Sequence, residues 1–309
     1  MNIKKLVPEL VTLGIILIGT LCYPLVSPGL QYAPPLLFAA LRTLIAGIGI
    51  FLLLPLFGQP RFPPKDIWKW ALLLSIPAVA FTYGTMFLSH INPKMTMLPV
   101  LENLQPFFSV FLASTFLHEK VSTSTRTVLV FGTVGLLFLS IQIFTGKMGF
   151  DFQSAILAIL ASLSASAASI LVKRLKRPDV IVTLSAWQLI VGSGLLFIFS
   201  WFFEKSAVVQ WNMSFISILA FLAIVGTGAT TVVWYKLIQK FDVSRLSVLF
   251  FLSPALGLVM ANRIYAVPVS LMEWIGVIII ICGVIVGLKM QSSTQNGATQ
   301  TLIRNEHSL

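Results

Sequence analysis

A glutamate with two prolines beside it lies inside the otherwise apolar stretch LPVLENLQPFF, where a carboxylate could carry a proton or bind a charged ligand. After this residue, Glu102, come Gln105, Pro106 and Ser109, at positions that one helix face would share. Pro106 has no N–H to donate to the carbonyl four residues back, and Pro99 has the same effect one turn earlier. The pattern therefore predicts a helix face with a carboxylate and freed backbone oxygens.

The elements that position this face must be membrane-spanning helices. Of the 309 residues, 57% are hydrophobic and only 10% are charged, against about 25% charged in a soluble domain. A span needs about 20 mostly apolar residues, and ten stretches qualify. They cover residues 7–26, 34–57, 70–90, 95–117, 126–144, 153–172, 181–203, 213–235, 244–265 and 271–289.

The basic residues indicate which side of the membrane each loop occupies. With ten spans, sixteen of the 21 lysines and arginines fall on the side of the N-terminus, four fall on the other side, and Arg42 lies within a span. The positive-inside rule then places both termini in the cytoplasm, in a multi-pass protein of the cytoplasmic (inner) membrane. The net charge of +11 is explained by these loops beside the lipid bilayer, and no nucleic-acid partner is expected. Residues 291–309 are polar and predict a disordered cytoplasmic tail.

The two halves of the chain resemble each other weakly. A shift of 148 residues aligns Pro106 with Pro254 and Gly135 with Gly283. Residues 1–145 and 146–290 then hold five spans each, and an odd number of spans makes the second half enter the membrane from the opposite side. Inverted repeats of this kind are typical of secondary transporters. The predicted fold is an all-α integral membrane protein with ten transmembrane helices in two inverted five-helix repeats.

A charge at membrane depth indicates function. Burying one costs about 2.5–3.5 kcal/mol on insertion scales, so such residues face the bundle interior. Freed carbonyls are likewise tolerated only against protein or a water-filled cavity. Glu102, Pro99 and Pro106 thus predict one wall of a central cavity, with Pro254 as the matching kink in the second half. Glu102 would couple transport to protons or bind a substrate amine. The alternative is a buried ion pair that only holds helices together.

Arg42 is the natural partner of Glu102. Both lie about 11–12 Å from the outer ends of their spans at 1.5 Å per residue, a depth that permits pairing. Arg42 could instead extend its charged end to the outer surface. His90, at the outer end of the third span, is a further coupling candidate because histidine titrates at about pH 6.5. Its alternative role is that of a hydrogen-bonded interfacial residue.

Other polar and aromatic residues lie near the middle of the spans. Together with Glu102, Arg42 and Gln105, the candidates for contact with substrate are Tyr83, Gln188, Trp234, Tyr235 and Ser253. For at least one of the pair Trp234 and Tyr235, the interfacial aromatic belt is the competing interpretation. Ser162, Ser166 and Ser169 share a helix face that favours close packing, and Gly283 with Gly287 forms a GxxxG pattern that suggests a homodimer.

The sequence also lacks the patterns of several function classes. Cys22 and Cys282 lie within spans and are interpreted as packing residues, and the three histidines are not at metal-ligand spacing. The chain contains no HExxH motif and no ATP-binding loop. We therefore expect no cofactor, no metal and no enzymatic activity, and an energy source in an ion gradient.

Several segments taken together resemble a known family. They are PPLLFAALRTLIAG (34–47), NLQPFFSVFLASTFLHEKVS (103–122), AILAILASLSASAASILVKRL (155–175), AWQLIVGSG (186–194) and LFFLSPALGLV (249–259). In order and spacing they resemble the drug/metabolite transporter superfamily, in particular its ten-span EamA-like bacterial members, over residues 7–290.

The resemblance implies an alternating-access cavity lined mainly by the third, fourth, eighth and ninth helices. It also implies export of amino acids or other small metabolites, often against proton flow. Glu119 matches a glutamate of the family, whereas its second-half counterpart is Val267. Glu102 is not a general family feature, which makes it a candidate determinant of the substrate.

The sequence therefore predicts a secondary active transporter that exports a small metabolite such as an amino acid, possibly coupled to protons, with the small-molecule substrate and the lipid bilayer as its partners. One alternative is uptake or exchange of a larger charged metabolite, such as a nucleotide-like or sulfonium compound. Another is a membrane scaffold that transports nothing and would survive loss of Glu102 and its prolines.

Overall fold

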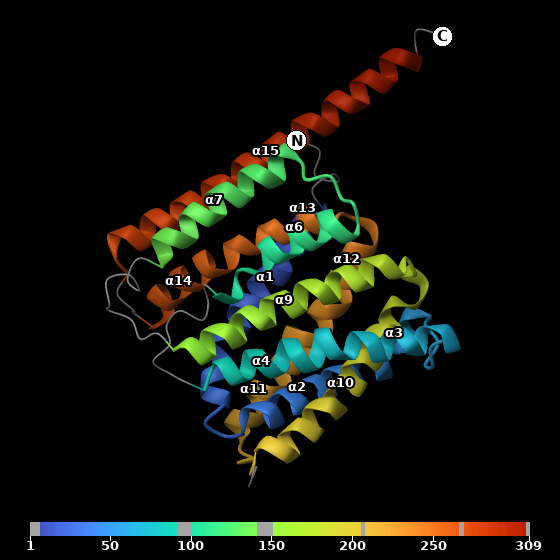
Figure 1. Cartoon of the computed structure of the whole chain (residues 1–309), viewed down its shortest axis with the longest axis vertical. Coiled ribbons are helices and arrows are strands. Elements are labelled where there is room, and N and C mark those ends of the chain that lie inside the picture. Colours follow the sequence, from blue (N-terminus) through green and yellow to red (C-terminus); the bar gives the residue numbers. More distant parts are fainter. Residues whose placement is uncertain (1–6, 92–100, 141–150, 205–207, 266–268, 307–309) are drawn as a thin grey trace.

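The structure of the protein, a computed structural model, is a bundle of helices (Figure 1). It describes residues 7–91, 101–140, 151–204, 208–265 and 269–306, and this part of the chain contains no strand. The helices in order are α1 (Val7–Gly29), α2 (Pro35–Leu53), η2 (Leu54–Phe57), α3 (Lys65–Ser75), η3 (Ile76–Phe81), α4 (Thr82–Ser89), α6 (Gln105–Phe116), α7 (Thr123–Leu139), α9 (Phe152–Leu175), η4 (Pro178–Val180), α10 (Ile181–Phe203), α11 (Met213–Ala223), η5 (Ile224–Ala229), α12 (Thr230–Lys240), α13 (Val243–Ser247), η6 (Val248–Phe251), α14 (Leu252–Tyr265) and α15 (Leu271–Glu306).

These helices form the predicted spans. Eight helical stretches in the described residues are long and apolar enough to cross a membrane, and α7 is a shorter apolar helix. The 12-residue α6 occupies the end of the fourth expected span, while Pro99 lies outside the described residues. The chain is an all-α membrane protein of about ten helices, which confirms the predicted fold class.

Two spans contain π-helical turns at matching positions. The third span runs through α3, η3 and α4, and the eighth through α11, η5 and α12; η3 and η5 are both π-helical. Their first residues, Ile76 and Ile224, are 148 positions apart, the same offset that aligns the two halves of the sequence. Because π-turns are rare and occur often at functional sites, these two positions direct attention to the space between the spans.

The fourth and ninth spans are interrupted where the prolines predict. A turn at Asn103 and Leu104 precedes α6, and the 3-10 segment η6 precedes α14. Pro106 and Pro254 lie in the first turns of α6 and α14. The N–H groups of a first turn have no acceptor within the helix, so a proline there removes no intrahelical hydrogen bond. Each proline therefore begins a helical segment within its span.

Carboxylates and other polar side chains fix several helix starts. Both oxygens of Glu204 accept backbone N–H groups at the start of α2, from Leu36 at 2.6 Å and Leu37 at 3.0 Å. Asp151 and Asn212 cap α9 and α11 by accepting N–H bonds three residues on. These caps hold the ends of spans whose apolar faces pack against their neighbours.

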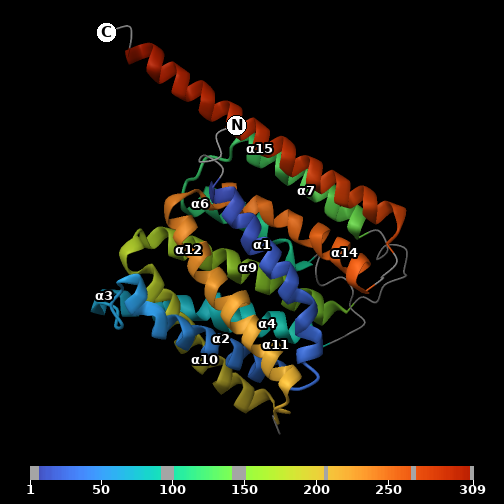
Figure 2. The ribbon, with the colours of Figure 1, turned by 180° about the vertical axis from the view of Figure 1, so that it is seen from behind.

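The helices α7 and α15 lie side by side (Figures 1 and 2). A Cβ added to Gly283 would lie 2.2 Å from Phe131, and one added to Gly287 would lie 2.3 Å from Val128, both on α7. The two glycines thus allow close packing within one chain, so their spacing no longer argues for an interface between chains. The homodimer remains a prediction that this structure does not test.

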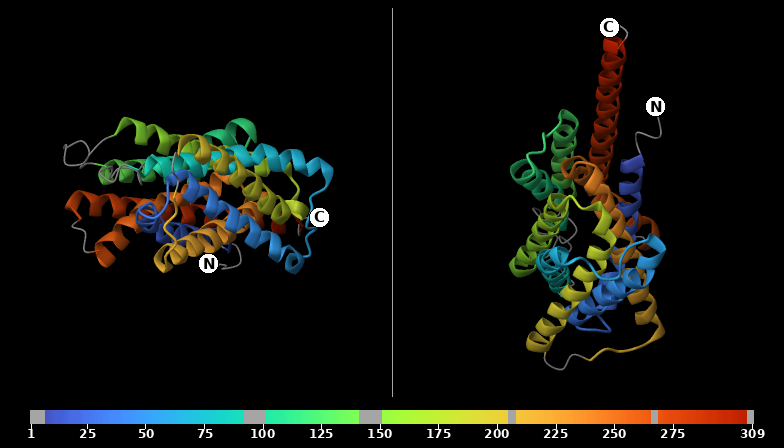
Figure 3. Two further views of the ribbon diagram at one scale, coloured as in Figure 1. Left: turned by 90° about the horizontal axis from the view of Figure 1, so that it is seen from below. Right: turned by 90° about the vertical axis from the view of Figure 1, so that its right-hand side faces the viewer.

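The C-terminal end of the chain differs from its sequence-based prediction. α15 continues to Glu306 and extends beyond the rest of the bundle (Figure 3), whereas the polar composition of 291–309 predicts disorder. Once a span has formed a helix, each further residue adds one hydrogen bond without a new nucleation cost, which favours propagation. The start of α1 and the far end of α15 lie at the same end of the molecule (Figures 1 and 2).

Candidate functional site

A cavity of about 210 Å³ lies among the interrupted spans. Its walls come from α1, the third span, α6, α9, α12 and η6, and the residues are Ile15, Ala78, Thr82, Tyr83, Gln105, Ala165, Ala168, Ser169, Thr230, Thr231, Trp234, Tyr235 and Phe250. The third, fourth, eighth and ninth spans all contribute, as the family resemblance implies, and α9 of the sixth span adds a wall.

Four of the predicted contact residues line this cavity: Tyr83, Gln105, Trp234 and Tyr235. Trp234 and Tyr235 are 8% and 5% exposed, which places them inside the bundle and not in an aromatic belt at the membrane surface. The Trp234 indole donates to the hydroxyl of Ser169 at 3.0 Å, and its ring meets Phe250 edge-on at 5.3 Å. These contacts hold the indole as part of the wall.

Gln188 supports the wall from behind. It is 1% exposed, and its amide Nε2 donates to the Tyr235 hydroxyl at 3.0 Å. Its Oε1 is buried without a hydrogen-bond partner in the described residues. Gln188 therefore orients Tyr235 and keeps one acceptor unused, as an inward-facing polar residue of a binding site would.

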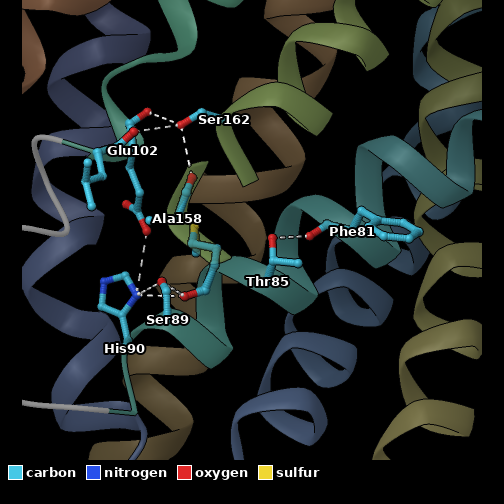
Figure 4. A network of polar contacts seen from close by, with 9 residues as sticks. Phe81, Thr85, Ser89, His90, Glu102, Ala158 and Ser162 are labelled. Atoms are coloured by element: carbon cyan, nitrogen blue, oxygen red, sulfur yellow. Dashed lines mark hydrogen bonds and ion pairs between the residues drawn. The ribbon is translucent and has the colours of Figure 1, made fainter. Parts of the chain in front are cut away.

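Glu102 lies beside His90 and not beside Arg42 (Figure 4). Its Oε1 is 3.7 Å from Nδ1 of His90, and the two side chains are 13% and 4% exposed. Nδ1 of His90 donates to the carbonyl of Met86 at 2.8 Å, which fixes the ring, and Nε2 has no partner in the described residues. The ring of Tyr23, a residue that the sequence did not single out, lies 5.2 Å away between centroids. The arrangement is a buried carboxylate–imidazole pair.

The serine face of α9 satisfies the carbonyls around Glu102. The Ser162 hydroxyl is 2.7 Å from the carbonyl oxygen of Glu102 and 3.1 Å from that of Leu101 (Figure 4). One turn along, the Ser166 hydroxyl donates to the carbonyl of Gln105 at 3.1 Å and accepts from Ser109 at 3.0 Å. The carbonyl freed by Pro106 is thus bonded to protein, and the predicted packing face also has this polar role.

Arg42 is buried beside Tyr83 and Phe87 of α4. Its side chain is 4% exposed and its Nε donates to the Thr227 hydroxyl at 2.7 Å. Its guanidinium carbon lies 5.2 Å from the ring centre of Tyr83 and 5.7 Å from that of Phe87. The interpretation that Arg42 extends to the outer surface is therefore wrong. The hypothesis that it pairs with Glu102 is also not supported, because Arg42 forms no salt bridge within the described residues.

The remaining predicted site residues lie apart from the cavity wall. Ser253 and Pro254 are in the first turn of α14, and neither lines the cavity. The sequence did not identify Thr227 as the hydrogen-bond partner of Arg42, although Thr227 lies in a segment rich in glycine and threonine. In the described residues, no group of three metal-ligating side chains comes together.

Comparison with known proteins agrees with this architecture. A solved crystal structure with 18% sequence identity superposes with a TM-score of 0.73, covering 90% of this chain and 94% of that one, and so shares the fold. The uncharacterized transporter YoaV of Bacillus subtilis is 28% identical over 286 residues, which are 89% of this chain and 95% of the relative. A probable amino-acid metabolite efflux pump of Escherichia coli is 22% identical over 301 residues, 92% of this chain and 96% of the pump.

One family description accounts for both halves of the chain. Residues 8–141 and residues 153–288 each match the EamA-like transporter family. The two matches are consecutive, together extend over most of the sequence and contain every span that surrounds the cavity. The chain therefore belongs to the EamA-like transporter family.

Proposed function

We propose that this transporter is a secondary active exporter of a small metabolite such as an amino acid, located in the cytoplasmic membrane with both termini in the cytoplasm. The observation that supports it best is the cavity between the interrupted spans, with the indole of Trp234 and the hydroxyl of Tyr235 on its wall. At about 210 Å³ the cavity is below the 300–1,000 Å³ that is typical of sites for drug-sized ligands. That size supports a small substrate.

The Glu102–His90 pair is the proposed proton-coupling site. The carboxylate and the imidazole lie 3.7 Å apart, and the two side chains are 13% and 4% exposed. A proton gained or lost by this pair changes its net charge by one unit, and away from water such a change alters the stability of the conformation that holds the pair. Glu102 lies three residues before Gln105, a residue of the cavity wall, so a change at the carboxylate is felt where the substrate binds. Proton entry from outside would drive export.

The similarity to a probable amino-acid metabolite efflux pump of Escherichia coli supports export of an amino-acid metabolite. Uptake or exchange of a larger charged metabolite is less well supported, because the cavity is small. A non-transporting scaffold is less well supported still, because a scaffold needs no internal cavity lined by polar side chains such as Gln105, Thr230 and Tyr235.

The test is metabolite profiling by mass spectrometry of cells and medium. Cells that produce the wild type are compared with cells that produce Glu102→Gln at equal membrane abundance. We expect at least one small metabolite to accumulate outside only with the wild type, and about a tenfold loss of its export in the variant, equivalent to about 1.4 kcal/mol.

Asp66→Asn is the matched control, because Asp66 is an exposed acid of α3 whose one ion pair within the described residues is with Arg177, at 3.3 Å. Its export should equal that of the wild type. Equal export by Glu102→Gln with unchanged dependence on external pH would assign Glu102 a structural role. Accumulation inside the cells would reverse the proposed direction, and no change for any compound would favour the scaffold.

A further inference from the structure

Arg42 is a buried cation without a protein anion. It is 4% exposed, and the structure gives it no salt bridge in the described part of the chain. Several other acids of the bundle are engaged elsewhere: the buried Glu9 pairs with Arg245, and the partly buried Glu119 and Glu204 cap helices. A guanidinium stays charged at any physiological pH, so its charge cannot be removed by losing a proton.

The contacts of Arg42 fix its position but do not neutralise it. The Thr227 hydroxyl accepts from Nε at 2.7 Å and donates to the carbonyl of Leu222 at 3.0 Å, which ties the side chain to the π-helical segment η5. The faces of Tyr83 and Phe87 give a cation–π contact that stabilises the charge in part. Both sets of contacts orient the guanidinium and leave its terminal nitrogen Nη1 without a partner in the described residues.

Nη1 of Arg42 is the donor atom that could bind a ligand. It is buried and has no hydrogen-bond partner in the described residues. An uncompensated buried charge with an unmade hydrogen bond is costly, and proteins rarely keep one without a use for it. The guanidinium group presents parallel N–H donors whose geometry matches a carboxylate.

The guanidinium is separated from the cavity by one side chain. Tyr83 lines the cavity, and its ring centre is 5.2 Å from the guanidinium carbon of Arg42. Tyr83 is the second residue of α4, which follows η3, and Thr227 lies in η5, so the contacts of the guanidinium come from within one π-helical segment and from the first turn after the other. A shift of the Tyr83 ring would connect Arg42 to the cavity.

We propose that Arg42 binds the carboxylate of the transported molecule, so that the substrates are small carboxylic acids and not amines. A single guanidinium with one unpaired nitrogen suits a group of one negative charge. This proposal rests on the proposed function, because it names the chemical class that the same cavity accepts.

The experiment is efflux from proteoliposomes loaded with sets of compounds that share a side chain. Each set holds an amino acid, the matching 2-hydroxy acid, the carboxamide and the decarboxylated amine, and efflux is followed by mass spectrometry. We expect the wild type to move at least one acid about tenfold or more faster than its carboxamide. Arg42→Gln should reduce that rate to the rate of the carboxamide.

Arg61→Gln is the matched control, because it removes the charge of an exposed arginine that does not line the cavity. Thr227→Val and Arg42→Lys keep the proposal testable if Arg42→Gln does not fold. The first removes the oxygen that orients the guanidinium, and the second keeps the charge without the forked donors, so both should lower the preference for acid over carboxamide.

Equal efflux of acid and carboxamide by the wild type would overturn the assignment of Arg42 and leave the transporter standing. Unchanged preference in both Thr227→Val and Arg42→Lys would also overturn it. If no compound leaves the proteoliposomes faster than it leaves protein-free liposomes, the proposed function is overturned and, with it, the role of Arg42.

Discussion

Several buried polar side chains near the cavity have one bonded atom and one atom without a partner in the described residues. Arg42 uses Nε and leaves Nη1, His90 uses Nδ1 and leaves Nε2, and Gln188 uses Nε2 and leaves Oε1. Folded proteins leave few such atoms, and each needs an explanation. Two of these side chains contact residues of the cavity wall: Gln188 contacts Tyr235, and Arg42 contacts Tyr83. Their unused atoms therefore lie directly behind the wall of the proposed binding site.

The Tyr235 hydroxyl gives a direct test of this interpretation at the residue scale. Tyr235→Phe removes the acceptor of the Gln188 amide and leaves a fully buried side chain with no partner in the described residues. We expect the free energy of unfolding to fall by about 1–3 kcal/mol, measured by denaturation in detergent. Gln188→Leu combined with Tyr235→Phe should cost less than the two single changes together. Additive losses would mean that the hydrogen bond contributes nothing.

The partners of Arg42 show what residue types and spacing cannot predict. Equal distance from the outer ends of their helices permits a pair between Arg42 and Glu102. Spacing says nothing of how each helix is rotated about its own axis, and that rotation turns Arg42 to Thr227 and Glu102 to His90. The sequence could therefore identify the charged residues but not which of them meet.

At the scale of elements, hydropathy predicts the spans well and their irregularities poorly. Composition places the eighth span at 213–235, and the structure has helix from Met213 to Lys240. The π-helical segments η3 and η5 were not predicted, because hydropathy reports burial and not hydrogen-bond register. Pro106 and Pro254 did indicate interruptions, because a proline removes a specific N–H.

The start of α13 depends on a side chain from another span. The carboxylate of Glu119, after α6, accepts the N–H groups of Val243 at 3.0 Å and Ser244 at 2.9 Å, and the Ser244 hydroxyl at 2.6 Å. Glu119→Gln replaces an acceptor oxygen with a donor, so we expect a loss of about 1.5–3 kcal/mol in unfolding free energy. Asp242→Asn is the control, because Asp242 precedes α13 but makes no capping bond. Equal stability of the two variants would contradict the cap.

The close contact between α7 and α15 predicts that a Gly→Ala change at this contact destabilises the protein, whereas the same change at an open position of α1 does not. In Gly283→Ala the new methyl group meets Phe131 at 2.2 Å, so overpacking should cost about 1–3 kcal/mol. Gly19 of α1 has no neighbouring atom within 4 Å of an added Cβ, so Gly19→Ala should be neutral or stabilise the helix by about 0.5–1 kcal/mol. Thermal unfolding of both variants measures this difference in stability. A Gly283→Ala protein as stable as Gly19→Ala would show that the helices do not pack this closely.

At the scale of the whole molecule, the orientation of the chain in the membrane determines which loops face the cytoplasm, and so whether proton entry from outside drives export or uptake. The asymmetry of basic residues predicts that the α2–α3 loop faces the cytoplasm and the α10–α11 loop faces outside. Two positions in these loops suit a test with cysteine: Lys65 at the start of α3 is exposed, and Val208 after α10 is 71% exposed.

The native Cys22 and Cys282 are first replaced by alanine, since Cys282 is exposed on the helix surface. A membrane-impermeant maleimide added to intact cells should then label Val208→Cys, whereas Lys65→Cys should react only after the membrane is opened. Charged loops are costly to move across a bilayer, so the two positions should not exchange sides. The reverse pattern would place both termini outside, and proton entry through His90 and Glu102 would then drive uptake. Labelling of both positions in intact cells would contradict the odd number of spans between them, and with it the inverted relation of the two halves.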